Sequence, residues 1–357
     1  IKKNRAMNIV HLIFNIRPGG MEYFLIDLVE AQCQSDNVTV VVVNRDNDAS
    51  MIENIKKYCR LVEIGRPQGS YNPYYVIKLN RVLKQLSPGV VNFHDRRLGA
   101  MILKRKEVRY IFTCHDMLQP LSFATRADKI IAVSEAVANW LKNKHNLESA
   151  VIQNGIAVDR IKQCSDRGLT SPIKLVSVAR LDHTVKGQHI LLKALSKLSD
   201  IDWTLDLIGE GASHHYLENL AKQLKIKYRV NFLSNVDRQD IYTRLSQYDI
   251  FILPSLNEAF SIALAEAMAA SLPVIISNLE GPKSVAGTGE YATVFTPGNS
   301  DDLTLKIMEV IADYPKAYAR AVSARKFIKE SFDINETAKR YRRFYLGCLQ
   351  KKMSRIG

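Results

Sequence analysis

Residues 250–276 read IFILPSLNEAFSIALAEAMAASLPVII and predict a strand, a loop, a helix and a second strand in succession. The first apolar run, Ile250–Leu253, has the length and composition of a buried strand. The segment Ser261–Ala270 is rich in Ala, Leu and Met, which have high helix propensity. A proline ends this helix and precedes the apolar run Val274–Ile276. Together these elements indicate one unit of an α/β sheet.

Carboxylates and backbone amides come together at the start of this helix. Glu258 lies in the preceding loop and Glu266 on the helix itself. The first N–H groups of the helix, on Phe260, Ser261 and Ile262, have no partner within a helix and favour an anion. The amides can donate hydrogen bonds to a phosphate, and the carboxylates can accept them from hydroxyl groups. This combination suits a nucleotide-activated sugar. An ordinary buried helix with solvated acids is the alternative interpretation.

Strands and helices alternate along the whole chain in two consecutive series, which predicts doubly wound parallel sheets. The segment Cys164–Pro172 separates the two series and has the composition of a linker. Ligands bind such sheets at the carboxyl ends of the strands. Two dipeptides fall at strand ends in the first series, His94–Asp95 and His115–Asp116. The first of them is either a second ligand pair or a polar strand end, and we favour the polar strand end.

A glycine turn, Gly19–Gly20, follows the first strand and precedes a helix. Such a turn lets the backbone approach a ligand closely. The glycines lack the G-x-G-x-x-G spacing of a dinucleotide-binding fingerprint, and Asn44 rather than an acidic residue follows the second strand. An NAD-dependent dehydrogenase is therefore disfavoured.

The composition is typical of a globular enzyme, with 357 residues of which 46% are apolar and 24% are charged. No apolar run approaches the roughly twenty residues that a membrane span needs. The first apolar run, Ile9–Phe14, is too short for a signal peptide. The five cysteines are odd in number and lack regular spacing, which predicts neither a disulfide framework nor a zinc site. We therefore expect a cytoplasmic protein.

The formal net charge is +14, and the most basic run lies at residues 96–109. Its cations, opposed by Glu107, are Arg96, Arg97, Lys104, Arg105, Lys106 and Arg109. Interleaved apolar residues suit adsorption to an anionic membrane, to which each cation adds about 1 kcal/mol. The alternative is a solvated helix face with an apolar stripe directed to the core. No recognised nucleic-acid-binding motif occurs, so we expect no nucleic acid partner.

Five segments occur in one order along the chain: ADKIIAVSEAV, IQNGIAVD, SVARLDHTVKG, LIGEGAS and NEAFSIALAEA. With these segments and the Gly19–Gly20 turn, the chain resembles the retaining glycosyltransferases of family 4, which have the GT-B fold. NEAFSIALAEA looks like the Glu-x7-Glu motif of that family, and SVARLDHTVKG looks like its Arg/Lys donor-phosphate motif. The resemblance runs from Met7 to about Leu349, which is nearly the whole chain.

The resemblance implies two groups of site residues. The catalytic residues would be His115, Arg180, Lys186 and Glu258. The donor-binding residues would be Gly19, Gly20, Gly209, Glu210, Phe260, Ser261, Ile262 and Glu266. Glu258 would contact the hydroxyls of the donor sugar and Glu266 those of the ribose, while Arg180 and Lys186 would neutralise the leaving diphosphate. His115 would hydrogen-bond the sugar or steady developing positive charge.

The resemblance also implies the architecture. We expect two Rossmann-like domains facing across a cleft, an N-terminal acceptor-side domain of residues 1–165 and a C-terminal nucleotide-sugar-binding domain of residues 166–334. The last helix, at about 335–357, is expected to pack back on the first domain. The spacing from Arg180 to Lys186 is one residue longer than is usual for the motif, which predicts a bulge at Asp182–Val185.

The implied activity is retaining transfer of a hexose or N-acetylhexosamine from a UDP-sugar to a glycan or lipid-linked acceptor in bacterial surface polysaccharide biosynthesis. Neither a metal ion nor a cofactor is expected, because Arg, Lys and a helix terminus would cover the diphosphate. The expected location is the cytoplasm, at the cytoplasmic face of the inner membrane where the basic run contacts anionic lipid. Two alternatives stay open, a nucleotide-sugar 2-epimerase of the same fold and a non-catalytic nucleotide-sugar-binding subunit.

Overall fold

The structure is a computed structural model that describes residues 6–117, 121, 123–166, 168–234 and 236–353. The chain forms two compact units, an N-terminal unit of Ile1–Gly155 with Ile334–Gly357 and a C-terminal unit of Ile156–Asp333. The division falls before Ile156, whereas the sequence analysis placed it after residue 165. The last residues of the expected C-terminal helix, 354–357, lie outside the described residues.

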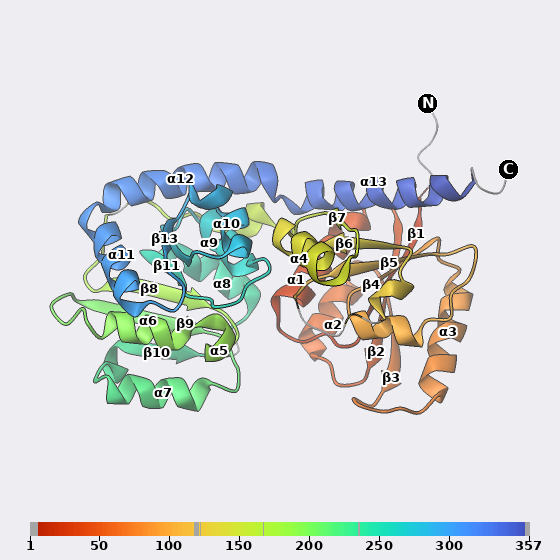
Figure 1. Ribbon diagram of the computed structural model, residues 1–357, viewed down its shortest axis with the longest axis horizontal. Helices are drawn as coiled ribbons and strands as arrows, with labels where there is room; N and C mark the ends of the chain where they lie inside the picture. Colours follow the sequence, from red (N-terminus) through yellow and green to blue (C-terminus); the bar gives the residue numbers. More distant parts are fainter. Residues whose placement is uncertain (1–5, 118–120, 122, 167, 235, 354–357) are drawn as a thin grey trace. The chain divides into compact units, whose positions relative to one another are not determined.

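The N-terminal unit is built on a seven-stranded sheet in the order β3-β2-β1-β4-β5-β6-β7, with every neighbouring pair parallel (Figure 1). Its strands are β1 Asn8–Ile13, β2 Asn37–Asn44, β3 Arg60–Arg66, β4 Val90–Phe93, β5 Arg109–Cys114, β6 Lys129–Ala132 and β7 Ala150–Val151. The strand order reverses direction between β1 and β4, which are hydrogen-bonded neighbours. This is the point at which such sheets bind ligands, beyond the carboxyl ends of the strands.

Five α-helices cover the faces of this sheet in the described part of the unit: α1 Gly20–Gln32, α2 Ala49–Lys56, α3 Tyr74–Leu86, α4 Glu135–His145 and α13 Ile334–Met353. The last of these, α13, comes from the far end of the chain and lies along the unit (Figure 1). It packs on α1, where the Tyr341 and Phe24 rings are 6.3 Å apart, and Arg342 pairs with the buried Asp36 at 2.9 Å. The apolar contact and the ion pair attach this distant segment to the N-terminal sheet.

The C-terminal unit repeats the design with a six-stranded parallel sheet in the order β10-β9-β8-β11-β12-β13. Its strands are β8 Ile173–Val178, β9 Trp203–Ile208, β10 Val230–Leu233, β11 Ile250–Leu253, β12 Val274–Ser277 and β13 Thr293–Phe295. Here the order reverses between β8 and β11. The doubly wound parallel sheets predicted from the sequence are therefore confirmed in both units.

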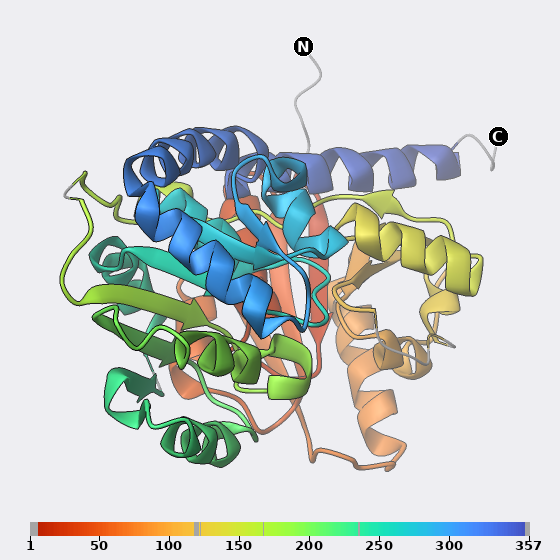
Figure 2. The ribbon, with the colours of Figure 1, turned by 60° about the vertical axis from the view of Figure 1, so that its left-hand side comes forward.

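The α-helices of the C-terminal unit are α5 His183–Lys186, α6 Gln188–Leu195, α7 His214–Gln223, α8 Arg238–Arg244, α9 Ile262–Ala269, α10 Glu280–Val285, α11 Ser300–Ala312 and α12 Tyr314–Ser331. Figure 2 shows α11 crossing one face of the sheet. The core between helices and sheet is aliphatic around Trp203, whose indole N–H donates to the Leu198 carbonyl (3.1 Å). The strands β11 and β12 are buried at every residue, which explains the continuous apolar runs that predicted them.

Two local features differ from the sequence analysis. The sequence analysis did not identify α10 or β13, which are short and lack a clear apolar period. Gly187 adopts a left-handed conformation between the one-turn helix α5 and the helix α6. The expected bulge at Asp182–Val185 is the turn of α5.

Candidate active site

The reversal point of the C-terminal sheet brings together the loops that follow β8 and β11. Val185, in the loop after β8, accepts hydrogen bonds from the amides of Leu256 (2.8 Å) and Asn257 (3.1 Å), in the loop after β11. Two segments far apart in sequence are thereby joined by backbone hydrogen bonds. The predicted residues Lys186 and Glu258 lie directly beside this junction.

An ion pair between Lys186 and Glu258 forms the centre of the site. Lys186 Nζ lies 2.7 Å from Glu258 Oε2, and the two side chains are only 19% and 9% exposed. The Ser255 hydroxyl donates to the same carboxylate oxygen at 3.1 Å. A charge so far removed from water is stable only with such partners. The structure therefore brings a cation and a carboxylate into contact at the carboxyl edge of the sheet.

Two glycines allow the backbone to hold this pair. Gly187 has a φ of +66°, and a Cβ atom on it would lie 2.0 Å from the Pro254 carbonyl oxygen. A Cβ atom on Gly281, in α10, would lie 2.1 Å from the Glu258 carbonyl oxygen. Side chains at these positions would force the loops apart. Close backbone contact on both sides thus fixes where Lys186 and Glu258 lie.

The second predicted carboxylate, Glu266, is held by a cation that the sequence analysis missed. Arg238, at the start of α8, places Nη2 at 3.0 Å and Nε at 3.2 Å from Glu266 Oε1. Both side chains are buried, at 12% and 7% exposure. A guanidinium fork on one oxygen fixes the carboxylate and supplies its counter-charge. Glu266 is therefore preorganised by Arg238.

The N-terminus of α9 lies in the same loop region. Ser261 is its N-cap, and its hydroxyl accepts a hydrogen bond from the Leu264 amide (3.3 Å). Phe260 and Ile262, on either side of it, are buried. The first amides of a helix carry partial positive charge that suits an anion. The predicted strand–loop–helix unit thus has the arrangement expected of it, with the helix beginning one residue after Ser261.

Arg180 differs from the other predicted cation. Its side chain is 69% exposed and pairs loosely with Asp182, at 3.6 Å. Only its backbone is tightly held, because the Gln188 side-chain amide donates to its carbonyl at 2.9 Å. The guanidinium is therefore available to a ligand at little cost in lost contacts.

The predicted Gly209 and Glu210 act through their backbone on the same loop. A Cβ atom on Gly209, whose φ is +140°, would lie 2.2 Å from the Ala179 carbonyl oxygen. The Glu210 carbonyl accepts a hydrogen bond from the Leu181 amide (2.8 Å), while the Glu210 side chain is exposed. This glycine turn supports the segment that carries Arg180.

In the N-terminal unit, Gly19 is the N-cap of α1 and Gly20 its first residue. Gly19 is extended, with a φ of −177°, so its conformation does not require glycine. A Cβ atom on it would lie 2.5 Å from Glu22 Oε2. Glu22 occupies the third position of the helix, from which a carboxylate folds back over the N-cap. The two glycines therefore lie at a helix start whose positive end already has an acidic neighbour.

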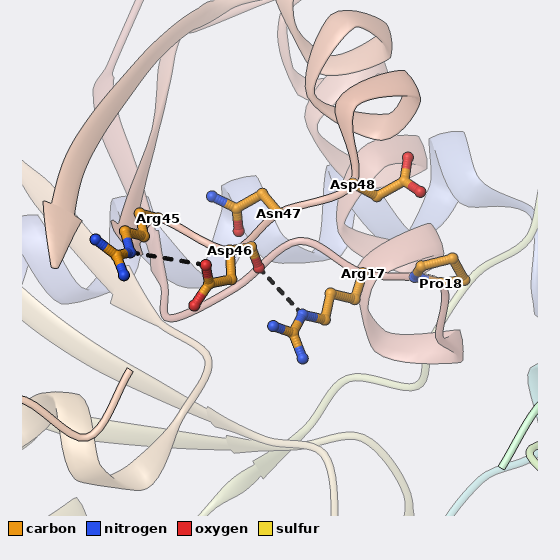
Figure 3. Close-up of a pocket in the computed structure, with 6 residues that line it drawn as sticks. All are labelled: Arg17, Pro18, Arg45, Asp46, Asn47 and Asp48. Atoms are coloured by element: carbon orange, nitrogen blue, oxygen red, sulfur yellow. Dashed lines mark hydrogen bonds and ion pairs between the residues drawn. The ribbon is translucent and has the colours of Figure 1, made fainter. Parts of the chain in front are cut away.

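Next to this turn lies an open pocket of about 480 Å³. Its lining, drawn in Figure 3, consists of Arg17, Pro18, Arg45, Asp46, Asn47 and Asp48. Arg17 Nε donates to the Asp46 carbonyl (3.0 Å), and Arg45 lies 3.8 Å from the Asp46 carboxylate. Mixed cations, carboxylates and amides of this kind suit a ligand rich in hydroxyl groups.

His115, the predicted catalytic residue of the N-terminal unit, belongs to a chain of buried imidazoles. Its Nε2 lies 2.9 Å from His94 Nδ1, and His94 Nε2 lies 2.9 Å from His11 Nδ1. The chain ends at Gln32, whose Oε1 is 2.7 Å from His11 Nε2. Burial lowers the pKa of His115 to about 3 and that of His11 to about 4, so both are neutral near pH 7.

The basic run at residues 96–109 does not form the continuous helix of the alternative interpretation. Arg96–Met101 is a 3₁₀ helix, and an irregular segment follows it. Leu98, Met101 and Ile102 are buried, whereas Leu103 is exposed. The ion pairs of the run are Arg96 with Asp116, Arg97 with Asp95, Lys104 with Asp128 and Arg105 with Glu107. Most of its apolar side chains therefore serve the core.

Within the described ranges, no group of three or more His, Cys, Asp and Glu side chains could hold a metal ion. Nor does any helix of those ranges combine the length and apolar character required to cross a membrane.

Sequence reasoning missed four side chains that support predicted ones: His11, Gln32, Arg238 and Ser255. A signal existed for His11, a polar residue inside the apolar run of β1. Ser255 directly follows the strand and its proline, at a typical ligand-binding edge. Arg238 and Gln32 lie in ordinary helical patterns, and only the fold brings them to their partners.

Two family models match the chain in succession. Residues 18–160 match the model described as Glycosyltransferase Family 4, and residues 162–327 match that described as Glycosyl transferases group 1. The glycogen synthase of Mycobacterium tuberculosis is 29% identical over 56% of this chain and 49% of its own. The chain thus spans about half the length of that relative. The putative glycosyltransferase EpsF of Bacillus subtilis is 25% identical over 90% of this chain and 91% of its own.

Solved structures of low sequence identity share the fold. HepE of Anabaena, in complex with UDP and glucose, aligns with a TM-score of 0.82 and 22% identity over 96% of this chain and all of that chain. WaaG, a glycosyltransferase involved in lipopolysaccharide biosynthesis, aligns with a TM-score of 0.73 and 16% identity over 93% and 98% of the two chains. With two consecutive family models and two Rossmann-like parallel-sheet domains, the chain belongs to the family 4 glycosyltransferases of the GT-B fold.

Proposed function

We propose that this protein transfers a hexose or an N-acetylhexosamine from a UDP-sugar to a glycan or lipid-linked acceptor, with retention of anomeric configuration. The observation that carries the proposal is the Lys186–Glu258 pair beside the start of α9, at the reversal point of the C-terminal sheet. Cleavage of a glycosyl phosphate produces a diphosphate and an electron-poor sugar carbon. Stabilising those charges requires a cation and a carboxylate held close together.

Each group has one role in this scheme. Lys186 and Arg180 stabilise the negative charge that builds on the leaving diphosphate, which the first amides of α9 also receive. Glu258 binds the sugar hydroxyls, and Glu266, oriented by Arg238, binds the ribose hydroxyls. These cations and amides provide the charge stabilisation that a metal ion supplies in other transferases, so the proposed mechanism is independent of metal.

The neutral state of His115 suits a role at the sugar. A protonated imidazole would repel the positive charge that develops on the reacting carbon. Because burial lowers the pKa of His115 to about 3, the ring is uncharged and can accept a hydrogen bond from a sugar hydroxyl. Gly19 and Gly20, at the start of α1, remain proposed donor-binding residues.

The proposal extends to the kind of acceptor and to its location. WaaG is involved in lipopolysaccharide biosynthesis, which favours a role in bacterial surface polysaccharide synthesis. Contact with an anionic membrane stays a prediction for the basic run at residues 96–109. Charge reversal at Lys104–Lys106 is expected to reduce flotation with anionic liposomes, and unchanged flotation would contradict this contact.

A donor screen tests the main proposal. The full chain is incubated with UDP-glucose, UDP-galactose and their N-acetyl counterparts without acceptor, and released UDP is measured. We expect slow hydrolysis of one donor, and a loss of about 100-fold or more in Glu258→Gln, since removing one preorganised electrostatic group typically costs this much. Glu309→Gln, in the exposed Lys306–Glu309 pair of the same unit, is the control.

The same reactions separate the alternatives. Formation of a 2-epimer without acceptor would identify an epimerase and overturn the transferase proposal. Donor binding with no turnover, in the presence or absence of saccharide acceptors, would instead identify a non-catalytic nucleotide-sugar-binding subunit.

A further inference from the structure

The imidazole chain of the N-terminal unit joins four elements. Gln32 comes from the last turn of α1, His11 from the middle of β1, and His94 and His115 directly follow β4 and β5. Three hydrogen bonds of 2.7–2.9 Å connect them in the order Gln32–His11–His94–His115. The Phe24 ring, also from α1, packs edge-on against His115 with the ring centroids 6.0 Å apart. The chain is therefore built into the core and fixed at both ends.

A neutral imidazole has one N–H donor and one bare nitrogen acceptor. Burial lowers the pKa of His94 well below its usual value and lowers those of His11 and His115 as well. With one proton on each ring, hydrogen bonds along the chain can be satisfied only if all of them point in the same direction. The nitrogen that carries the proton in the ring at one end then determines which nitrogen carries it in the ring at the other end.

Gln32 sets the direction of these hydrogen bonds, because the Gln32 atom that faces His11 is a carbonyl oxygen, which can only accept a hydrogen bond. His11 must therefore carry its proton on Nε2, so His94 donates from Nε2 to His11 Nδ1. His115 in turn donates from Nε2 to His94 Nδ1. What remains is His115 Nδ1, a bare nitrogen that is buried and has no hydrogen-bond partner among the described residues.

We propose that Gln32, His11 and His94 are positioning residues that hold His115 in the tautomer protonated on Nε2, which leaves the lone pair on Nδ1. The tautomer follows from the geometry of the N-terminal unit alone. Naming the partner of Nδ1 as a sugar hydroxyl of the donor rests on the proposed function. In that role, Nδ1 accepts a hydrogen bond from the hydroxyl, and the ring stays uncharged beside the developing positive charge.

Nitrogen-15 NMR of the full chain with labelled histidine tests the tautomer directly, because it distinguishes a protonated ring nitrogen from a bare one. We expect His11, His94 and His115 all to be protonated on Nε2 at neutral pH, with couplings across the two N–H···N hydrogen bonds. A proton on His115 Nδ1 in the wild-type protein would overturn the proposal without any variant.

Gln32→Met then tests the role of the distant amide, which has no contact with His115. Without an acceptor at Gln32 the direction is no longer imposed, and we expect His115 to populate both tautomers. Gln34→Met, an exposed position just after α1, is the matched control and should leave every tautomer unchanged. A single unchanged tautomer of His115 in a folded Gln32→Met protein would contradict the relay.

Donor turnover supplies the second readout. If wild type hydrolyses a UDP-sugar, Gln32→Met should lower kcat about tenfold with little change in KM, the effect of one weakened hydrogen bond in the transition state. A shifted tautomer with unchanged kcat would overturn the positioning role. If wild type turns over no UDP-sugar, the proposed function fails, and the NMR result still decides the relay.

Discussion

The reversal points of the two sheets use opposite electrostatics on the same topology. In the C-terminal unit, the side chains are charged and paired, Lys186 with Glu258 at 2.7 Å and Arg238 with Glu266 at 3.0 Å. In the N-terminal unit, the corresponding edge holds neutral imidazoles connected by hydrogen bonds. Both sets are largely removed from water. The difference lies in what each can offer a ligand, charge in one unit and hydrogen-bond direction in the other.

This difference matches the two parts of a nucleotide sugar. The diphosphate carries formal charge, and stabilising it requires cations and helix amides. The sugar carries only hydroxyl groups, and a buried cation beside its reacting carbon would raise the barrier. An ion pair loses its function when one partner is removed. A chain of neutral imidazoles loses its function when its hydrogen bonds no longer all point in the same direction. Variants that remove a charge and variants that change the direction of these hydrogen bonds should therefore have different effects.

The largest expected effect is on folding, from Arg238→Met. This change leaves the Glu266 carboxylate, 7% exposed, without its guanidinium, and breaking such a buried pair costs about 3–5 kcal/mol. Urea denaturation followed by circular dichroism should show a lower midpoint with an unchanged slope. Arg244→Met, an exposed position on the same helix, is the control. A midpoint equal to wild type would mean that Glu266 does not depend on Arg238.

Lys186→Met should act mainly on the reaction. It removes the cation nearest Glu258, and loss of one preorganised charge costs about 10²–10³-fold in kcat. Hydrolysis of the preferred UDP-sugar is the measurement, and Lys306→Met, in an exposed Lys–Glu pair, is the control. Lys186→Arg keeps the charge and the fold and should recover part of the rate. Equal rates for the Met variant and wild type would remove Lys186 from the leaving-group role.

Acid should destabilise the imidazole chain. The pKa of His11 falls from 6.5 to about 4 on folding, so the unfolded chain binds more protons between these values. The free energy of unfolding is therefore undiminished above pH 6.5 and falls as the pH is lowered toward 4. At pH 5 the loss is about 2 kcal/mol for this one residue. Denaturation midpoints at pH 7 and pH 5 measure it, with His11→Asn expected to be less sensitive to acid.

The fold could be predicted from the sequence because both sheets are parallel and buried. Strands such as β11 and β12 are short apolar runs bounded by polar turns, and this pattern reveals them without tertiary information. The short elements α10 and β13 lack such a pattern, so only packing on the finished sheet defines them. The single turn of α5 before the left-handed Gly187 likewise has no apolar period of its own.

Sequence reasoning found candidate residues where chemistry and position coincide in one segment. Glu258 and Lys186 lie in the segments that follow β11 and β8, and the structure brings them into contact. Arg238 and Gln32 could not be found in this way, because their partners are distant in sequence and their own helices are ordinary. Their roles follow from contacts that only the completed fold creates. Side chains that orient a site residue are therefore harder to predict from the sequence than the site residue itself.

The smallest expected effect is that of Ser255→Ala. The Ser255 hydroxyl donates to Glu258 Oε2 at 3.1 Å, the same oxygen that Lys186 binds, so its loss leaves the carboxylate charged and still paired. One neutral hydrogen bond to a carboxylate contributes about 1 kcal/mol, or about fivefold in kcat for the preferred UDP-sugar. Ser196→Ala, whose hydroxyl is exposed, is the control. A loss as large as that of Lys186→Met would mean that the hydroxyl, rather than the cation, positions Glu258, and that hydrogen-bond direction governs both units.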